Sequence, residues 1–288
     1  MSVDIWRRLL HMDKRIIYFT MLLAIVAPMF VPFGLPIRIS QPMTDFYNTI
    51  QSMPEGSYVV IAAETSPSQM AEHRPAVMCL FRHLYERKAR IIIQSVTSTQ
   101  GPNLVLEWAS PVINELGMEY GVDYAIPGYR TGGNATMDQA RFNYIETFTD
   151  TDIYGGKLSA LPIMQEFTKA SDAYMVVNFH AGTTPYVNTW LATGDVSIIL
   201  TAPNAVVITS DMVLYNAGLI KGLCGGMAGA AMYERLVEKP GSATKGMDSQ
   251  GVGHLVIILL VIIGNIGYFI VTKADENRRE NRPVASES

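Results

Sequence analysis

The chain has 288 residues, a formal net charge of −4 and a 49% share of hydrophobic residues. A slightly acidic chain lacks the basic surface with which proteins bind nucleic acid, so no nucleic-acid partner is expected. Its two cysteines are too few for a disulfide scaffold. Cys79 and Cys224 both lie in apolar stretches, which favours free buried thiols, although a bridge between them stays open.

Two uncharged apolar segments, residues 16–37 and 251–272, stand near the two ends of the chain. Each is about as long as the ~20 residues with which a helix crosses a bilayer, so we expect two transmembrane helices. A cleavable signal peptide is the alternative for the first segment. No small-residue cleavage site follows it, and Pro28, Pro32 and Pro36 crowd the place where one would lie, which favours a retained anchor.

Positive charges predict the orientation of these segments, because cytoplasmic tails and loops are enriched in Lys and Arg. Tails 1–15 and 273–288 are therefore expected in the cytoplasm and domain 38–250 outside it. The tail charges outnumber those at the membrane-facing ends of the domain: Arg7, Arg8, Lys14, Arg15, Lys273, Arg278, Arg279 and Arg282 against Arg38, Lys239 and Lys245. Asn265, between two glycines of the second segment, is expected to contact either Thr20 or another subunit.

Between the anchors, β-branched runs alternate with amphipathic segments. This alternation predicts a single doubly wound, mainly parallel-sheet, Rossmann-like α/β domain. The expected strands are 58–63, 90–96, 123–126, 173–179 and 196–201. The expected helices are 44–53, 75–88, 103–120, 161–170, 185–192, 209–216 and 219–238. Residues 138–160 are poorly periodic and predict a long ordered loop suited to a contact surface.

Polar residues follow the expected strands, where the ligands of open parallel sheets bind. The candidate ligand-binding residues are Glu64, Ser98, Arg130, His180 and Thr183. Turns and helix caps, which are rich in the same residue types, are the alternative explanation. The chain has neither a Gly-x-Gly-x-x-Gly motif nor a Walker-type Gly-Lys-Ser/Thr motif, so we expect no nucleotide cofactor. The histidine spacing predicts no metal site.

Residues 222–226 (GLCGG) match the Gly-x-nucleophile-x-Gly pattern, but a nucleophile elbow needs a preceding strand. The segment is interpreted instead as part of one Gly/Ala-rich helix. Four glycines of this helix are then candidates for close packing or oligomer contacts: Gly222, Gly225, Gly226 and Gly229, with Asn265 of the second anchor as a fifth candidate. A cysteine hydrolase that uses Cys224 and His180 remains the alternative.

Three blocks of the sequence resemble segments of a group of uncharacterised prokaryotic membrane-anchored α/β proteins: 120–133 (YGVDYAIPGYRTGG), 161–164 (LPIM) and 222–236 (GLCGGMAGAAMYERL). The resemblance implies a prokaryotic origin and an α/β fold, and it implies no activity.

Two functional hypotheses follow from these patterns. The first is a non-enzymatic scaffold or assembly subunit anchored in a lipid bilayer, in a homo-oligomer or with other membrane proteins. The second is a small-molecule-binding protein or hydrolase that uses Glu64, Arg130 and His180 at the strand ends.

Overall fold

A computed structural model describes residues 3–31, 33–182 and 185–280. The chain forms two compact units. The α/β unit comprises Pro36–Thr244, and the helical unit comprises Met1–Leu35 and Lys245–Ser288. Each unit is described by itself.

The α/β unit is built on a six-stranded, all-parallel sheet with the strand order β3-β2-β1-β4-β5-β6. The order reverses between β1 and β4, as in a Rossmann fold. Every residue of β1 and β4 is buried, which explains why β1 has an unbroken apolar run. The strands are β1 (Tyr58–Glu64), β2 (Arg90–Ser95), β3 (Tyr124–Tyr129), β4 (Met175–His180), β5 (Ile199–Pro203) and β6 (Gly222–Leu223). The predicted α/β class with a parallel sheet is confirmed.

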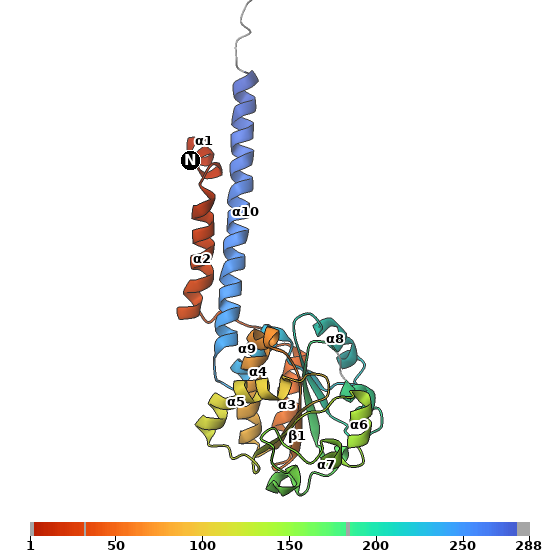
Figure 1. The fold of residues 1–288 in the computed structure, drawn as a ribbon. Helices are drawn as coiled ribbons and strands as arrows, with labels where there is room; N and C mark the ends of the chain where they lie inside the picture. The colour runs from red at the N-terminus through yellow and green to blue at the C-terminus, as the bar shows by residue number, and fades with distance from the viewer. Residues whose placement is uncertain (1–2, 32, 183–184, 281–288) are drawn as a thin grey trace, which may run out of the picture. The chain divides into compact units, whose positions relative to one another are not determined.

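Helices cover both faces of this sheet. In Figure 1, α4, α5 and α9 lie on one side of the strands, and α6, α7 and α8 lie on the other. The helices of the unit are α3 (Gln41–Gln51), α4 (Met70–Glu86), α5 (Gly101–Leu116), α6 (Asn134–Ala140), α7 (Tyr144–Thr147), α8 (Ile208–Asn216) and α9 (Gly226–Leu236). Short helical turns are η1 (Pro67–Gln69), η2 (Leu158–Ala160), η3 (Pro162–Met164), η4 (Ala170–Asp172) and the π-type η5 (Val187–Leu191).

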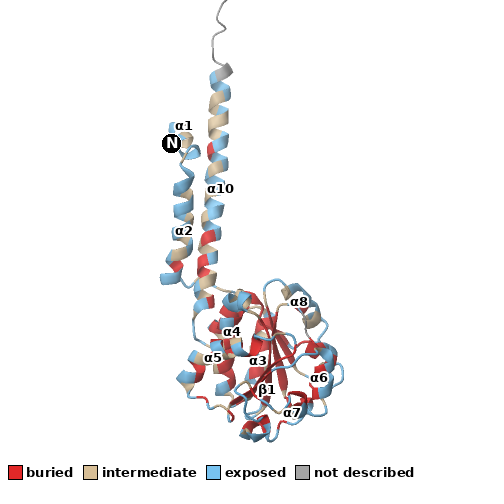
Figure 2. Ribbon diagram, in the orientation of Figure 1, coloured by how far each residue is buried: buried red, intermediate tan, exposed pale blue. Residues whose placement is uncertain are grey.

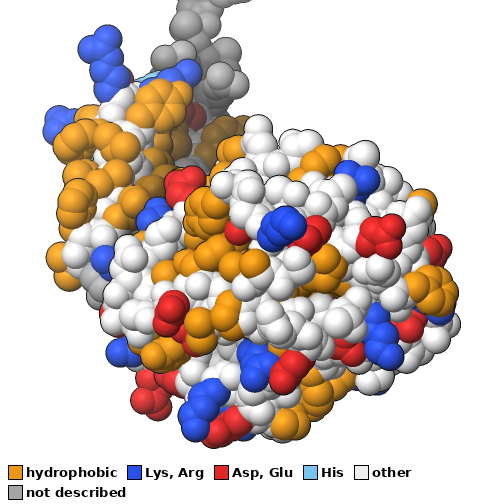
Figure 3. Space-filling model, turned by 60° about the horizontal axis from the view of Figure 1, so that its bottom comes forward, with side chains coloured by type: hydrophobic (Ala, Val, Ile, Leu, Met, Phe, Trp, Pro, Cys, Tyr) orange, Lys and Arg blue, Asp and Glu red, His pale blue; other side chains and the backbone are white. Residues whose placement is uncertain are grey.

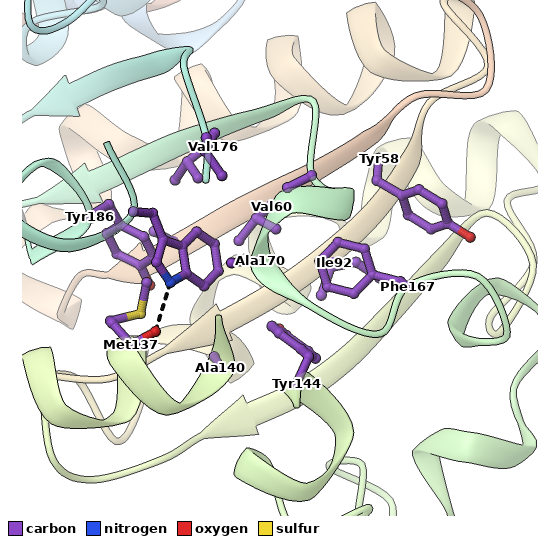
Figure 4. Packing of buried hydrophobic residues seen from close by; sticks show 14 of the residues in the cluster. Tyr58, Val60, Ile92, Met137, Ala140, Tyr144, Phe167, Ala170, Val176 and Tyr186 are labelled. Atoms are coloured by element: carbon purple, nitrogen blue, oxygen red, sulfur yellow. Dashed lines mark hydrogen bonds between the residues drawn. The ribbon is translucent and has the colours of Figure 1, made fainter. Parts of the chain in front are cut away.

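The long connection from β3 to β4 forms much of the core on one face of the sheet. Figure 4 shows its Tyr144 and Phe167 close to Ile92 of β2, within one buried apolar cluster. A dashed line there marks the 2.8 Å hydrogen bond from Trp190 Nε1 to the Met137 carbonyl. Residues 138–160, predicted as a loop with a contact surface, therefore include α7 and bury two of their four aromatic side chains, Tyr144 and Phe148. The other two, Phe142 and Tyr154, are 78% and 63% exposed.

Other expected elements differ from the structure, because a regular pattern over a short segment cannot report tertiary packing. The predicted helix 161–170 is replaced by 3-10 turns around Pro162, and the helix 185–192 is π-type. The predicted helix 219–238 is wrong at its start, since residues Gly222–Leu223 form strand β6 beside β5. A two-residue edge strand that contains glycine has no periodicity to reveal it.

The helical unit contains α1 (Val3–Leu10), α2 (Lys14–Phe30) and most of α10 (Ser242–Glu280). Among the described residues one helix, over Ser242–Arg278, is long and apolar enough to cross a membrane. The prediction of a second such helix at 16–37 is not confirmed. Helix α2 has 17 residues and ends at Phe30, so at 1.5 Å per residue it is about 25 Å long. Three prolines in this segment, with Gly34 at φ +64°, oppose a longer helix.

One polar side chain in the apolar stretch of each long helix bonds within its own helix. Asn265 donates to the Val261 carbonyl at 2.8 Å, and Thr20 donates to the Ile16 carbonyl at 2.9 Å. The alternative in which Asn265 contacts Thr20 is therefore not what the structure shows. Helix α10 instead meets the N-terminal segment at Asp248, which accepts from the backbone N–H groups of Gly34 (2.8 Å) and Leu35 (2.9 Å).

The last helix of the α/β unit holds the start of α10 through one buried carboxylate. Glu234 of α9 accepts hydrogen bonds from the backbone N–H groups of Gly241 (2.9 Å), Ala243 (3.0 Å) and Thr244 (2.8 Å), and from the Thr244 hydroxyl. These N–H groups lie at the first turn of α10, where no carbonyl of the helix can accept from them. Residues 241–244 are therefore held against α9 within the α/β unit.

The buried residues of the α/β unit are concentrated in the strands of the sheet, and its charged side chains are spread over the surface. Figure 2 shows the strands as the most continuously buried part of the α/β unit. On the face drawn in Figure 3, acidic and basic side chains are interspersed over this unit.

Candidate functional site

A depression of about 380 Å³ lies at the carboxyl ends of β1 and β2. It adjoins the end of β4 through Ala181, so it lies at the place where the strand order reverses. In open α/β sheets this crevice is the usual ligand site. Its lining consists almost entirely of hydroxyl and amide side chains: Glu64, Thr65, Ser66, Gln69, Thr97, Ser98, Thr99, Gln100 and Ala181.

Glu64, at the end of β1, is the one charged residue of this lining. It is 7% exposed and accepts six hydrogen bonds. Five come from the end of β2 and the residues after it. The donors are the N–H groups of Val96 (2.9 Å), Thr97 (2.9 Å) and Ser98 (3.2 Å), and the hydroxyls of Ser95 (2.6 Å) and Thr97. A carboxylate has about four lone-pair sites, so Glu64 has none left for a ligand.

The sixth donor to Glu64 is Tyr186, whose hydroxyl lies 3.1 Å from the carboxylate. The same hydroxyl accepts from Gln94 at 3.3 Å, and Gln94 accepts from Tyr144. Burial, reinforced by the Glu64 carboxylate, raises the pKa of Tyr186 well above its ordinary value. Every member of this buried network has a partner, so the network holds the β1 and β2 ends in place. The sequence signal for it was Gln94, one polar residue inside an apolar strand.

Ser98 also has a structural role. Its hydroxyl donates to the Thr65 carbonyl at 2.6 Å and accepts from the Gly101 N–H at 3.1 Å, which ties the loop to the start of α5. The groups that remain free to meet a ligand are the side chains of Thr99 and Gln100. Both are exposed, and neither makes a side-chain hydrogen bond within the described chain.

His180 lies beside Glu64 in the register of β4 and β1, but it is buried and does not line the depression. Its Nε2 is 3.0 Å from Asp211 of α8. Asp211 is the one buried residue of that nine-residue helix, so the contact fastens α8 to the sheet. The sequence analysis missed Asp211, because nothing in a solvent-facing helix pattern marks one acid as the buried one.

The remaining predicted site residues do not join this group. Arg130 is exposed and lines a different depression of about 430 Å³, with Gln139, Phe142 and Glu146 among its neighbours. The expectation that Glu64, Arg130 and His180 meet in one pocket is therefore wrong: Arg130 lies with residues 139–147, and His180 is buried and does not line the depression. Thr183 lies outside the described residues.

Cys224 stands between strand β6 and helix α9, so the strand-then-helix context that the sequence analysis rejected is present. Its chemistry is nevertheless unfavourable. The thiol is buried, and burial raises its pKa to about 12, whereas a nucleophile needs an accessible thiolate. His180 bonds to Asp211 and not to Cys224. Cys79 and Cys224 are both free, so the alternative of a bridge between them is wrong.

The four glycines around Cys224 pack inside the unit. A Cβ on Gly222 would lie 2.4 Å from the Phe46 backbone of α3, and one on Gly229 would lie 2.6 Å from the Cys224 carbonyl carbon. A Cβ on Gly225 would meet Ile208, and Gly226 has φ +58° beside Glu72. All four glycines therefore lie where a side chain would be crowded or strained, and an oligomer contact through them stays a prediction.

His73 of α4 is a second buried histidine near the strand ends, and Thr65 lies 2.7 Å from its Nδ1. Burial, with a smaller effect of the nearby His180, lowers its pKa from 6.5 to about 3. Below pH 6.5 His73 is therefore protonated in the unfolded chain, whereas in the folded chain it stays neutral down to about pH 3. Stability must fall as the pH falls through this window.

We accordingly predict that His73→Leu flattens the loss of stability in acid. Between pH 6 and pH 4 the slope of the unfolding free energy should decrease by up to about 1.4 kcal/mol per pH unit, the value for one proton. Urea unfolding of the full chain in mild detergent at several pH values measures both slopes. Parallel slopes for the variant and the parent protein would contradict the prediction.

Within the described residues no three His, Cys, Asp or Glu side chains gather as metal ligands. The fold and the depression define a doubly wound α/β protein with a polar site at the switch point of its sheet. Comparison with protein-family models, curated proteins and solved structures returned no match.

Proposed function

We propose that the α/β unit binds a small, uncharged, hydroxyl-rich molecule, and that α10 holds the unit at a membrane. The observation that carries the proposal is the depression of about 380 Å³ at the point where the strand order reverses. The orientation expected from the Lys and Arg counts, with the unit outside the cytoplasm, completes the proposal.

The lining supports an uncharged ligand. An anion needs a cationic side chain or free N–H groups, and the lining contains no Lys or Arg. The N–H groups of residues 96–98 already donate to Glu64. A cation needs a free carboxylate, and the six bonds to Glu64 leave it none. Hydroxyl and amide groups remain, and they recognise sugars and polyols by paired donors and acceptors.

Titration calorimetry with the full chain in mild detergent tests this proposal. The probes are neutral sugars and polyols, with sugar phosphates and sugar acids as charged counterparts. We expect a neutral probe to bind. Gln100→Leu and Thr99→Val should each weaken its binding about tenfold, the value of one lost hydrogen bond. Ala181→Leu should weaken it by filling the depression.

Ser197→Ala is the matched control, because Ser197 is exposed in a separate depression beside the amino ends of the strands. It should leave the affinity unchanged. If none of the neutral probes binds, or if Ala181→Leu leaves their affinity unchanged, the proposal is wrong.

Assembly through the helical unit is a second candidate function. It is favoured by the surface of α10, where a Cβ placed on Gly264 would have no atom within 4 Å and where Asn265 is exposed. Most large apolar side chains of α10 are exposed as well, including Leu259 (56%) and Phe269 (66%). In a bilayer such a surface meets lipid or a second copy of the helix.

The native mass in mild detergent tests this candidate. We expect a homo-oligomer that dissociates on Gly264→Ile. Gly267 is not a suitable second position, because a Cβ there would lie 2.9 Å from Trp6 and would disturb the packing within one chain. A monomeric parent protein would remove the assembly function and would leave the ligand-binding proposal untouched.

A further inference from the structure

A second polar cluster lies on β4 and β5, beside the site described above. Asn178 and Thr201 are paired in the register of the two strands, and His180 follows Asn178 by two residues. Side chains two residues apart on a strand share a face, so the three side chains point to the same side of the sheet. All three are buried: Asn178 and Thr201 are 0% exposed, and His180 is 1% exposed.

This β4–β5 cluster differs from the neighbouring network around Glu64 in its hydrogen bonds. Within the described parts of the chain, four of its polar atoms have no partner: Asn178 Nδ2 and Oδ1, His180 Nδ1 and Thr201 Oγ1. A polar atom buried without a partner is costly, because it loses its bonds to water and gains none in the protein. Four such atoms in one cluster favour a group that supplies the missing bonds.

The free atoms specify the chemistry of that group. Asp211 accepts from His180 Nε2 at 3.0 Å, so in the neutral tautomer that makes this bond the other ring nitrogen, Nδ1, is an acceptor. Asn178 offers one donor group and one acceptor, and the Thr201 hydroxyl can act as either. A hydroxyl group, which both donates and accepts, complements this set. The cluster contains no unpaired charge with which to hold an ion.

We propose that Asn178, His180 and Thr201 form a buried site that binds one neutral hydroxyl group. This group comes either from a water molecule or from the solute proposed to bind in the strand-end depression. The second source rests on the proposed function and on the position of His180, which is in register with Glu64 and precedes Ala181 of the lining. The first source does not depend on the proposed function.

A double-mutant cycle decides whether the site is occupied, because the sign of the stability change depends on it. The variants are Asn178→Leu, Thr201→Val and their combination, measured by urea unfolding of the full chain in mild detergent. If a hydroxyl bridges the two side chains, each single change destabilises the protein and the double change costs less than the sum. If the atoms have no partner, replacement by apolar groups of similar shape stabilises the protein, which would overturn the proposal.

Thr136→Val calibrates the cycle. The Thr136 hydroxyl is buried and donates to the Thr131 carbonyl at 2.6 Å, so its loss shows what one satisfied hydroxyl is worth in this protein. We expect Thr201→Val to destabilise by a similar amount. A further variant, Thr183→Ala combined with Thr184→Ala, should leave the coupling between Asn178 and Thr201 unchanged. If it abolishes the coupling, the chain itself supplies the partner and the proposal is wrong.

A calorimetric titration distinguishes the two sources of the hydroxyl group. It measures the affinity of the variants of the double-mutant cycle for the neutral sugar that binds the parent protein best. A loss of affinity of about tenfold in Thr201→Val assigns the hydroxyl to the solute. Unchanged affinity, with the stability loss retained, assigns it to water. If no sugar binds at all, the proposed function fails, but the stability cycle still decides whether the site holds a water molecule.

Discussion

Gly101→Ala is expected to unfold the α/β unit or to leave it barely stable. Gly101 begins α5 against the end of β1, and a Cβ placed on it would lie 1.6 Å from the Ala63 carbonyl oxygen. The position of the Cβ is fixed by the backbone of residue 101, and the oxygen belongs to the main chain of Ala63, so neither can move aside as the end of a flexible side chain would. We expect a loss of about 4 kcal/mol or more in the free energy of unfolding, which is exceptional for a single substitution.

Urea unfolding of the full chain in mild detergent, followed by circular dichroism, measures this loss. Gly222→Ala is a second variant with the same expected direction, since its Cβ would lie 2.4 Å from the Phe46 backbone. Gly182→Ala is the control, because no atom of the described residues lies within 4 Å of its Cβ position and no positive φ is required there. If Gly101→Ala were as stable as Gly182→Ala, the close contact of α5 with β1 would be wrong.

Glu64→Gln is expected to cost several kcal/mol, because each hydrogen bond to a charged group contributes about 1.5–3 kcal/mol and more than one of them is lost. The carboxylate accepts bonds from six donors, and a carboxamide turns an NH₂ group toward some of them. Donors would then face donors at the end of β1. The segment of residues 95–98 should lose its fixed position, so neutral sugar binding at the depression should be lost as well.

Glu166→Gln is the matched control for this substitution. Glu166 pairs with Arg90 at 2.5 Å, but its side chain is 71% exposed, and an exposed ion pair contributes about 0–1 kcal/mol. The two variants should differ by several-fold in their effect on the urea midpoint. Equal midpoints would show that Glu64 does not hold the strand ends together.

The alternation of apolar runs and amphipathic segments was sufficient to predict the α/β class, because a parallel sheet buried on both faces demands unbroken apolar strands. Strands β1, β2 and β4 were located within a few residues for this reason. The short strand β6 and the turns at η2, η3 and η4 were not, since their conformation depends on what packs against them. Gly222, for example, is in a strand because α3 and β5 approach it.

The sequence predicted where the candidate site lies in the sheet, but not what its residues do there. Polar residues after the strands indicated the carboxyl edge of the sheet, where the depression lies, and Glu64 and Ser98 do line it. Their roles could not be predicted, because whether a carboxylate is free or saturated depends on donors from a different strand. Arg130 follows β3 in the same way as Glu64 follows β1, yet its side chain lies in another depression.

The sequence by itself determined two features of the protein. The first is an α/β unit with a buried parallel sheet, and the second is a set of apolar segments of which one, in α10, is long enough to cross a membrane. These features depend on local hydrophobic pattern and length, which a linear chain displays directly. The tertiary structure alone decided that Glu64 is saturated, that His180 meets Asp211, and that Asn178 and Thr201 lie buried side by side. Hydrogen bonds between strands and helices far apart in the chain determine which polar groups remain free, and no local pattern records them.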